Sequence, residues 1–260
     1  MTSLIKIDNY DLYIGISFIF LVCSILNFYL KIGLQKLMLI AFLRSIFQLL
    51  FLGIIVSYIF GLPSWSLVFP VLAMILIASF RNGNVKKLGE VFNRYISIFF
   101  SVVPMGIFTL LIVGAKSFDS PKTVIPIFGM LIGNSLNGVV LGVERFESEI
   151  RNHRDLFISD LSFGLSPIFA AKKYIQVALK AAMTPILNAM SIVGIVSIPG
   201  MMTGQILSGA SPFEASKYQL LILVSIMGTI FIGAIIGILV SLKSMVKNDY
   251  LFLTEKLRRG

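Results

Sequence analysis

The feature that most constrains this chain is a series of seven apolar runs separated by short polar segments. Hydrophobic residues make up 57% of the sequence and charged residues only 13%, about half the share usual in soluble proteins. All runs but one approach the roughly 20 residues with which a helix crosses a hydrocarbon core. The chain is therefore predicted to be an all-α polytopic membrane protein with seven transmembrane helices, and not an enzyme. The predicted spans are Leu12 to Leu30, Leu37 to Phe60, Trp65 to Phe80, Tyr95 to Gly114, Val124 to Val143, Pro185 to Leu207 and Leu220 to Leu242.

The third run, Trp65 to Phe80, is shorter than the others and contains Pro70. A short hydrophobic helix is accommodated by a small tilt or by local thinning of the bilayer. The alternative is that this span continues past Arg81. The bounds of the third span are left open at this stage.

The distribution of Lys and Arg predicts the orientation, because positively charged loops stay on the cytoplasmic side. The segments after spans one, three, five and seven carry seventeen basic residues, whereas the alternate segments carry four and Arg44 lies within the second span. This distribution puts the N-terminus outside and the C-terminus in the cytoplasm. The net charge of +10 is spread over these short segments, which indicates contact with anionic membrane lipid and not with nucleic acid.

The chain is predicted to form a single transmembrane domain over residues 1–260, because it has no internal repeat and no linker long enough to separate soluble domains. Its start lacks the basic residues and cleavage site of a secretory signal, so the first run is expected to be retained as a span. The single cysteine, Cys23, excludes a disulfide within the chain.

One sizeable polar stretch, from Glu144 to Thr184, is predicted to be cytoplasmic. Its first half continues the fifth span as a water-exposed helix, supported by Glu147 and Arg151 four residues apart. After Gly164, apolar residues alternate with lysines, which predicts a short amphipathic helix at the membrane surface between spans five and six. Such a helix either docks a protein or is a connector held by lipid headgroups. Its apolar residues are Ile168, Phe169, Ala171, Ile175 and Leu179.

Polar residues within the second span are the first candidates for a solute path. Arg44 lies about two turns into this span, with Gln48 one turn later on the same face. A charge at that depth costs about 2 to 3 kcal/mol on insertion scales, so it is expected to face protein or water. The alternative is that Arg44 extends its side chain towards the cytoplasm.

Spans five and six supply the other candidates. Span five carries Asn134 and Asn137 beside Gly129 and Gly133, a pair of small residues typical of close helix packing. These amides serve either that packing or a solute path.

Span six contains Asn188 and is interrupted by Pro199 and Gly200 near its outer end. A broken helix at membrane depth is tolerated where protein or a watery cavity satisfies its backbone. The segment from Pro199 to Gln205, with Met201 and Met202, is therefore a candidate gate, and a kink for packing is the alternative.

Several kinds of site are not found in the sequence. No G-x-x-x-x-G-K-[ST] motif is present, so this chain is not expected to bind ATP through a P-loop. The single histidine, His153, lies in the polar stretch, and no carboxylate lies deep within a span, which argues against a proton relay or a hard-cation site. No catalytic residue is predicted. A metal site is not assigned, because methionines in apolar helices are usually packing residues.

Three segments resemble the FetB family of ABC-transporter permeases, whose plant relatives are linked to aluminium tolerance. They are RSIFQLLFLG from Arg44, MLIGNSLNGVVLGVERFESEI from Met130, and AAMTPILNAMSIVGIVSIPGMMTGQILSGASPFEASKYQ from Ala181. The resemblance implies a permease in the bacterial inner membrane that pairs with a second copy and with a separate ATPase, which would hold the ATP and Mg. Bacterial members are associated with iron export, and plant members with nucleotide-sugar transport.

The resemblance also implies a role for the segment from Asp160 to Lys173, which is similar to the coupling element that permeases insert into their ATPase. Asp160 and Gly164 match the acidic residue and the glycine of that element only in part. The ATPase-coupling residues implied in this way are Asp160, Gly164, Ser166, Pro167, Lys172 and Lys173. The residues expected along the solute path are Arg44, Gln48, Asn134, Asn137, Asn188 and Gln205.

Other functions stay open on the sequence alone. Free iron prefers carboxylate, imidazole or thiolate ligands, whereas the one deep charge here is positive, which suits an iron chelate or another anionic conjugate better. A secondary transporter working alone and a membrane scaffold that recruits a partner are the alternatives from other classes.

Overall fold

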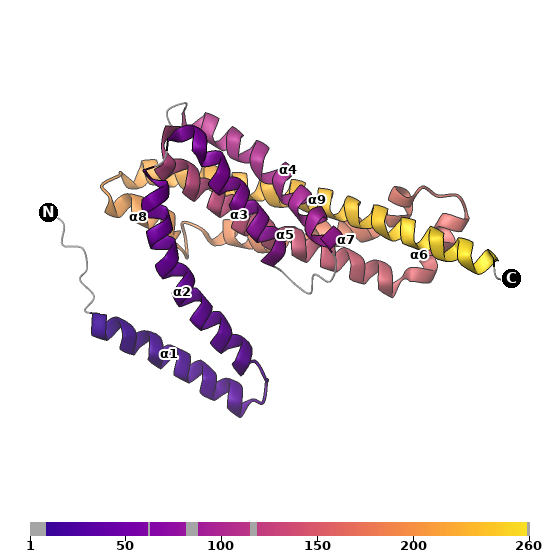
Figure 1. Cartoon of the computed structure of the whole chain (residues 1–260), viewed down its shortest axis with the longest axis horizontal. Coiled ribbons are helices and arrows are strands. Elements are labelled where there is room, and N and C mark those ends of the chain that lie inside the picture. The colour runs from indigo at the N-terminus through magenta and orange to yellow at the C-terminus, as the bar shows by residue number, and fades with distance from the viewer. Residues whose placement is uncertain (1–8, 62, 82–87, 115–118, 259–260) are drawn as a thin grey trace. The chain divides into compact units, whose positions relative to one another are not determined.

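The computed structural model describes residues 9–61, 63–81, 88–114 and 119–258 (Figure 1). Within these ranges the regular elements are helices, which confirms the all-α prediction. The chain divides into two compact units, Met1–Phe60 and Gly61–Gly260, and each is described by itself.

The first unit is a helical hairpin of α1 (Asn9–Tyr29) and α2 (Gln35–Ile59). The chain reverses between them through Lys31 and Gly33, which have φ values of 51° and 80°. The two helices touch through Phe20 and Phe42, whose ring centroids lie 4.5 Å apart. None of the α2 side chains is buried. The apolar surface of this hairpin is therefore free to meet lipid or protein.

The second unit is a bundle in which α9 packs against α4, α5 and α7 (Figure 1). Fully buried side chains of α3, α4, α5 and α9 form its core, among them Ile75, Ile98, Leu131 and Ile222. Its elements are η1 (Ser64–Leu67), α3 (Val68–Arg81), α4 (Leu88–Val113), α5 (Pro121–Asn152), α6 (Arg154–Ser162), α7 (Pro167–Ile192), α8 (Gly200–Leu207) and α9 (Pro212–Arg258).

Five helices of the described residues are long and apolar enough to cross a membrane, and two shorter apolar helices accompany them. The long ones are Gln35–Ile59, Phe92–Val113, Pro121–Asn152, Pro167–Ile192 and Pro212–Val246, and the shorter ones are Ile14–Tyr29 and Ser64–Phe80. Each predicted span overlaps one of these helices, while the number of crossings and the orientation stay predictions. Continuation of the third span past Arg81 falls on residues 82–87, outside the described residues. The loop residues Lys6, Lys86, Lys87, Lys116 and Arg259, which were counted for the orientation, also lie outside them.

The prediction of a separate amphipathic helix between spans five and six is wrong. Pro167–Ile192 is one helix of 26 residues that contains both the lysine-rich segment and the start of the predicted sixth span. Pro185 lies inside it, and the Thr184 hydroxyl donates a hydrogen bond of 2.7 Å to the Lys180 carbonyl just before it. A proline is tolerated within a transmembrane helix where neighbouring groups satisfy the backbone that it leaves free. Because Ala181 to Met183 favour helix, nothing in the chain separates the two parts.

The predicted break at Pro199 and Gly200 begins earlier than expected. α7 ends at Ile192, and the next helix starts at Gly200. Between them, Gly194 with φ 82° allows a compact turn in which its N–H donates to the Ser197 carbonyl at 2.9 Å. Pro199 is the residue before α8 and not the centre of a kink.

The close packing of α4, α5 and α9 depends on small residues, but not on the predicted pair. Of that pair, a Cβ on Gly129 would lie 3.3 Å from the Met74 side chain of α3, whereas a Cβ on Gly133 would meet nothing within 4 Å. A Cβ on Gly233 of α9 would lie 2.8 Å from Val139 of α5 and 2.9 Å from the Ser101 hydroxyl of α4. Gly233 therefore marks where three helices approach closely, which only their tertiary arrangement reveals.

Candidate functional site

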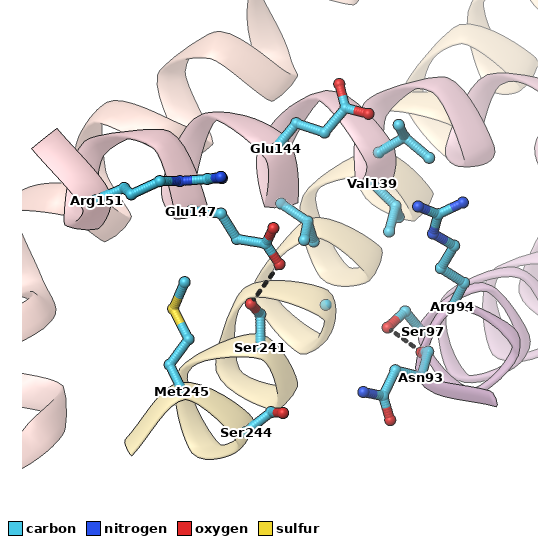
Figure 2. A pocket seen from close by; sticks show the side chains of 13 residues that line it. Asn93, Arg94, Ser97, Val139, Glu144, Glu147, Arg151, Ser241, Ser244 and Met245 are labelled. Atoms are coloured by element: carbon cyan, nitrogen blue, oxygen red, sulfur yellow. Dashed lines mark hydrogen bonds between the residues drawn. The ribbon is translucent and has the colours of Figure 1, made fainter. Parts of the chain in front are cut away.

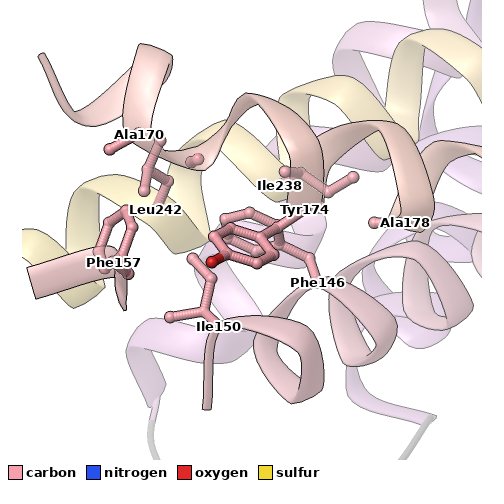
Figure 3. Close-up of a cluster of buried hydrophobic side chains, with 9 residues drawn as sticks. Phe146, Ile150, Phe157, Ala170, Tyr174, Ala178, Ile238 and Leu242 are labelled. Atoms are coloured by element: carbon pink, nitrogen blue, oxygen red, sulfur yellow. The ribbon is translucent and has the colours of Figure 1, made fainter. Parts of the chain in front are cut away.

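A buried apolar cluster fixes the predicted cytoplasmic segment to the bundle (Figure 3). Phe146 and Ile150 of α5, Phe157 of α6, Tyr174 of α7 and Leu242 of α9 meet in it. Phe157 and Phe146 have no exposed surface. Because side chains from four helices interlock here, α6 and the first turns of α7 are a firm extension of the bundle and not a loose connector.

The turn from α6 to α7 is built by Gly164, whose φ of 87° lies in the left-handed region that favours glycine. The Gly164 N–H donates to the Leu161 carbonyl, and the Leu165 N–H donates to the Asp160 carbonyl, each at 3.1 Å. These two hydrogen bonds form a Schellman motif, the common helix ending with glycine. Asp160 and Gly164 of the expected coupling element are thus brought together through the backbone.

The remaining coupling residues begin α7. Ser166 is the residue before the helix and Pro167 its first residue, where the missing N–H of proline has no cost. Lys172 and Lys173 are exposed on the next turn. All six expected coupling residues therefore lie on one continuous turn and helix start.

Exposed apolar side chains surround this turn, and we call Phe163, Leu165, Ile168 and Phe169 the α6–α7 tip. Phe163 is 84% exposed and Phe169 is 68% exposed. Sequence reasoning placed Ile168 and Phe169 on one stripe with Ala171, Ile175 and Leu179. The last three instead belong to the buried cluster or pack against it. The apolar tip is thus separate from the face that anchors α7.

The predicted solute-path amides of α5 and α7 lie at one level of the bundle. A Cβ on Gly142 of α5 would lie 3.2 Å from the Cβ of Ala182 of α7. These two residues therefore lie side by side, and positions along the two antiparallel helices can be compared from this contact. Asn137 is about 7.5 Å along α5 from this contact, and Asn188 is about 9 Å along α7 in the same direction. Asn134, Asn137 and Asn188 are all exposed. The Asn134 amide donates to the Met130 carbonyl of its own helix at 2.8 Å, and none of the three side chains is buried between helices.

The other predicted path residues lie elsewhere. Arg44 and Gln48 are exposed on α2 of the first unit. Gln205 is half-buried in α8, and its Oε1 atom is buried with no hydrogen-bond partner. The structure brings Asn134, Asn137 and Asn188 to one level and places Gln205 on a different helix.

The predicted gate residues begin α8, which packs against α9. Met201 and Met202 are half-buried, while Gly200 is exposed. The Thr203 hydroxyl lies 3.2 Å from the Pro199 carbonyl, to which it donates. In the preceding turn, Ile195 is 88% exposed.

Sequence reasoning missed a polar cavity of about 560 Å³ that α4, α5 and α9 enclose (Figure 2). Its lining includes Arg94 of α4, Glu147 and Arg151 of α5, and Ser241 of α9. Glu147 was expected to support α5 through Arg151, but it accepts a hydrogen bond of 2.8 Å from the Ser241 hydroxyl. Nearby on α5, Arg145 and Glu149 form an ion pair at 2.8 Å. No signal in the sequence connects residues so far apart along the chain.

Comparison with known proteins places the chain in a family. The model of the uncharacterised protein family UPF0014 matches residues 9–246. The chain belongs to the UPF0014 family. The match covers α1 and α2 as well as the bundle, so both units are part of the family's common sequence. UPF0014 relatives named as membrane proteins, together with several apolar helices, show that the chain is a multi-pass membrane protein.

Individual relatives extend this result. The UPF0014 membrane protein slr1647 of Synechocystis is 32% identical over 72% of this chain and 74% of its own length. The probable iron export permease protein FetB of Escherichia coli is 29% identical over 88% of this chain and 89% of its own length. The Arabidopsis protein ALUMINUM SENSITIVE 3 is 27% identical over 83% of this chain and 79% of its own length. These matches confirm the resemblance to FetB and to the plant proteins. No solved structure matches the chain.

Proposed function

We propose that this chain is the transmembrane permease subunit of an ABC transporter in the bacterial inner membrane. Two copies assemble with a separate ATPase that binds ATP and Mg, and the complex exports iron or an iron-containing solute. The observation that carries this proposal is the α6–α7 tip, an exposed apolar surface that the buried cluster of Figure 3 holds against the bundle.

The tip suits a protein partner for two reasons. Exposed apolar side chains that lie together mark interaction sites, and aromatic residues are enriched in the centres of interfaces. The buried cluster beneath the tip transmits force, because Phe157 and Tyr174 connect it to α5 and α9. A partner that pulls or pushes the tip therefore moves the long helices of the bundle.

The exposed amides support a path between two copies of the chain. A side-chain amide at membrane depth needs protein or water, because lipid tails offer no hydrogen-bond partner. Asn134, Asn137 and Asn188 meet this need if a second copy, or a watery path between two copies, covers the face of α5 and α7.

The chemistry of this face favours a complexed cargo over a bare ion. Amides are neutral hydrogen-bonding groups, whereas free iron is usually held by carboxylate, imidazole or thiolate ligands. An iron chelate is therefore the form of iron that this face fits. A nucleotide sugar or another anionic conjugate is the second candidate, because it would use the same amides.

The test is ATP hydrolysis by the permease and its candidate ATPase in liposomes, titrated with iron salts, iron chelates and nucleotide sugars. Stimulation by an iron compound is expected. Phe163→Asp should prevent copurification of the ATPase, while Phe213→Asp, an exposed phenylalanine at the start of α9, should not. If the Phe163→Asp variant still copurifies with the ATPase, the docking assignment is wrong. If wild-type chain forms no complex, the scaffold and secondary-transporter alternatives return.

A further inference from the structure

The polar cavity between α4, α5 and α9 is not used by the coupling or solute-path residues. Its volume of about 560 Å³ lies within the range of about 300–1,000 Å³ typical of small-molecule sites. Figure 2 shows Arg94 reaching into it from α4, across from Glu147 and Ser241. Asn93, Ser97 and Ser244 add further polar groups to its wall.

Some polar groups of this wall have hydrogen-bond partners, whereas one nitrogen of the Arg94 guanidinium has none. Glu147 accepts from Ser241, and the Ser97 hydroxyl donates to the Asn93 carbonyl at 2.8 Å. The Nη1 atom of Arg94 is buried and has no hydrogen-bond partner. A buried charged donor without an acceptor is costly. The group that this cavity lacks beside Arg94 is therefore an acceptor, and a negatively charged acceptor suits a guanidinium best.

We infer that the cavity binds a phosphate group at Arg94. A guanidinium presents its N–H groups in a fork that matches the oxygens of phosphate. The hydroxyl of Ser244 and the amide of Asn93 offer additional donors to a group with several acceptor oxygens. Glu144 and Glu147 both line the cavity from α5 and repel an anion, so the phosphate lies on the α4 side, beside Arg94.

The phosphate has two sources with the same chemistry. In the predicted orientation the cavity lies at the cytoplasmic ends of the three helices, where anionic phospholipid headgroups and soluble phosphate are both present. Either ligand, bound in the cavity, would bridge α4 to α5 and α9 at the cytoplasmic ends of these helices. The inference is independent of the proposed transport function.

The experiment measures binding to the full-length protein, delipidated in an uncharged detergent, by thermal shift and by native mass spectrometry. The probes are inorganic phosphate and short-chain phosphatidylglycerol, with the phosphate-free lipid monoolein as the blank. At least one phosphate probe is expected to bind, and Arg94→Gln to weaken it at least about tenfold. Binding of inorganic phosphate indicates a soluble ligand, and binding of phosphatidylglycerol alone indicates a headgroup.

Two further variants separate binding from folding. Arg145→Gln, on the same helix end but paired with Glu149 and outside the cavity, should bind as wild type does. Glu147→Gln should bind phosphate as tightly as wild type or more tightly, because a repelling charge is lost. The inference is overturned if neither probe binds, if Arg94→Gln keeps its affinity, or if Arg94→Gln without ligand melts well below wild type. The last result would mean that the guanidinium is already satisfied.

Discussion

At the scale of single residues, the bundle is held by small side chains and hydroxyls whose partners lie far away in the sequence. The Thr109 hydroxyl of α4 donates to the Ser225 hydroxyl of α9 at 2.8 Å, and the hydroxyls of Ser101 and Ser135 lie 3.3 Å apart. Hydrogen bonds between transmembrane helices contribute about 0.6 kcal/mol each on average. The Ser101 hydroxyl also faces Gly233, where an added Cβ would lie 2.9 Å from it. The hydroxyls of Thr109, Ser225, Ser101 and Ser135 therefore serve helix packing and not a solute path.

Gly233→Ala is expected to destabilise the protein by about 1–3 kcal/mol, because the added methyl overlaps Val139 and Ser101. Thermal unfolding in detergent measures this change. Gly133→Ala is the matched control, since its methyl would meet nothing within 4 Å. Equal melting temperatures for the two variants would show that α9 does not approach α4 and α5 as described.

Two phenylalanines of neighbouring elements should separate stability from docking. Phe157→Ala is expected to lower stability by about 3–5 kcal/mol, because it leaves a cavity in the buried cluster. Phe163→Ala, from an 84% exposed position, should leave the melting temperature unchanged and weaken binding of the ATPase. Loss of stability in the Phe163 variant would indicate that the tip is part of the core.

At the scale of elements, the α6–α7 turn and the unbroken α7 decide how the predicted cytoplasmic segment is presented. The Schellman motif ends α6 and aims the tip away from the cluster. Because α7 continues from the tip to Ile192 without a break, with Pro185 inside it, Phe169 and Asn188 lie on one continuous helix. A separate surface helix would not have this property.

Gly164→Ala is expected to weaken binding of the ATPase while membrane insertion stays normal. A side chain at a φ of 87° costs about 1–2 kcal/mol, so the turn should change shape. Copurification with the ATPase and limited proteolysis of the α6–α7 turn check this prediction. Gly204→Ala in α8 serves as the control, since nothing lies within 4 Å of its added methyl. Identical protease patterns for Gly164→Ala and wild type would contradict the role of this turn.

At the scale of the whole molecule, the chain combines a hairpin of two apolar helices with a helical bundle. The apolar sides of α2 include Phe47, Leu49 and Leu50, all more than two-thirds exposed. Such a surface requires lipid or protein around it. The chain therefore folds in a membrane, as its family relatives also indicate.

The predicted orientation is testable with single cysteines in a Cys23→Ser background. Lys217→Cys, at the start of α9, should react with a membrane-impermeant maleimide in intact cells. Lys173→Cys should react only after the membrane is opened, because its segment is predicted to be cytoplasmic. Both lysine positions are exposed, so side-chain burial does not confuse the result. Labelling of Lys173→Cys in intact cells would show that the orientation is the opposite of the predicted one.

The sequence by itself determined the membrane nature of the chain, its helical class and the rough place of each apolar helix, because length and hydrophobicity set these directly. It also carried the family resemblance. The turn at Gly164 and the start of α7 at Pro167 also follow from local signals, while the coupling role of these residues is implied by the resemblance and stays a prediction.

Only the tertiary structure decided which polar residues are packed and which are exposed. A helix that is apolar on all sides carries little periodicity, so the sequence could not show that Ser101 points inwards while Asn137 points outwards. It could not show that Gly233, and not Gly133, is the close contact. The cavity around Arg94, Glu147 and Ser241 was also beyond reach, because it exists only where α9 meets α4 and α5, which are far from it in the chain.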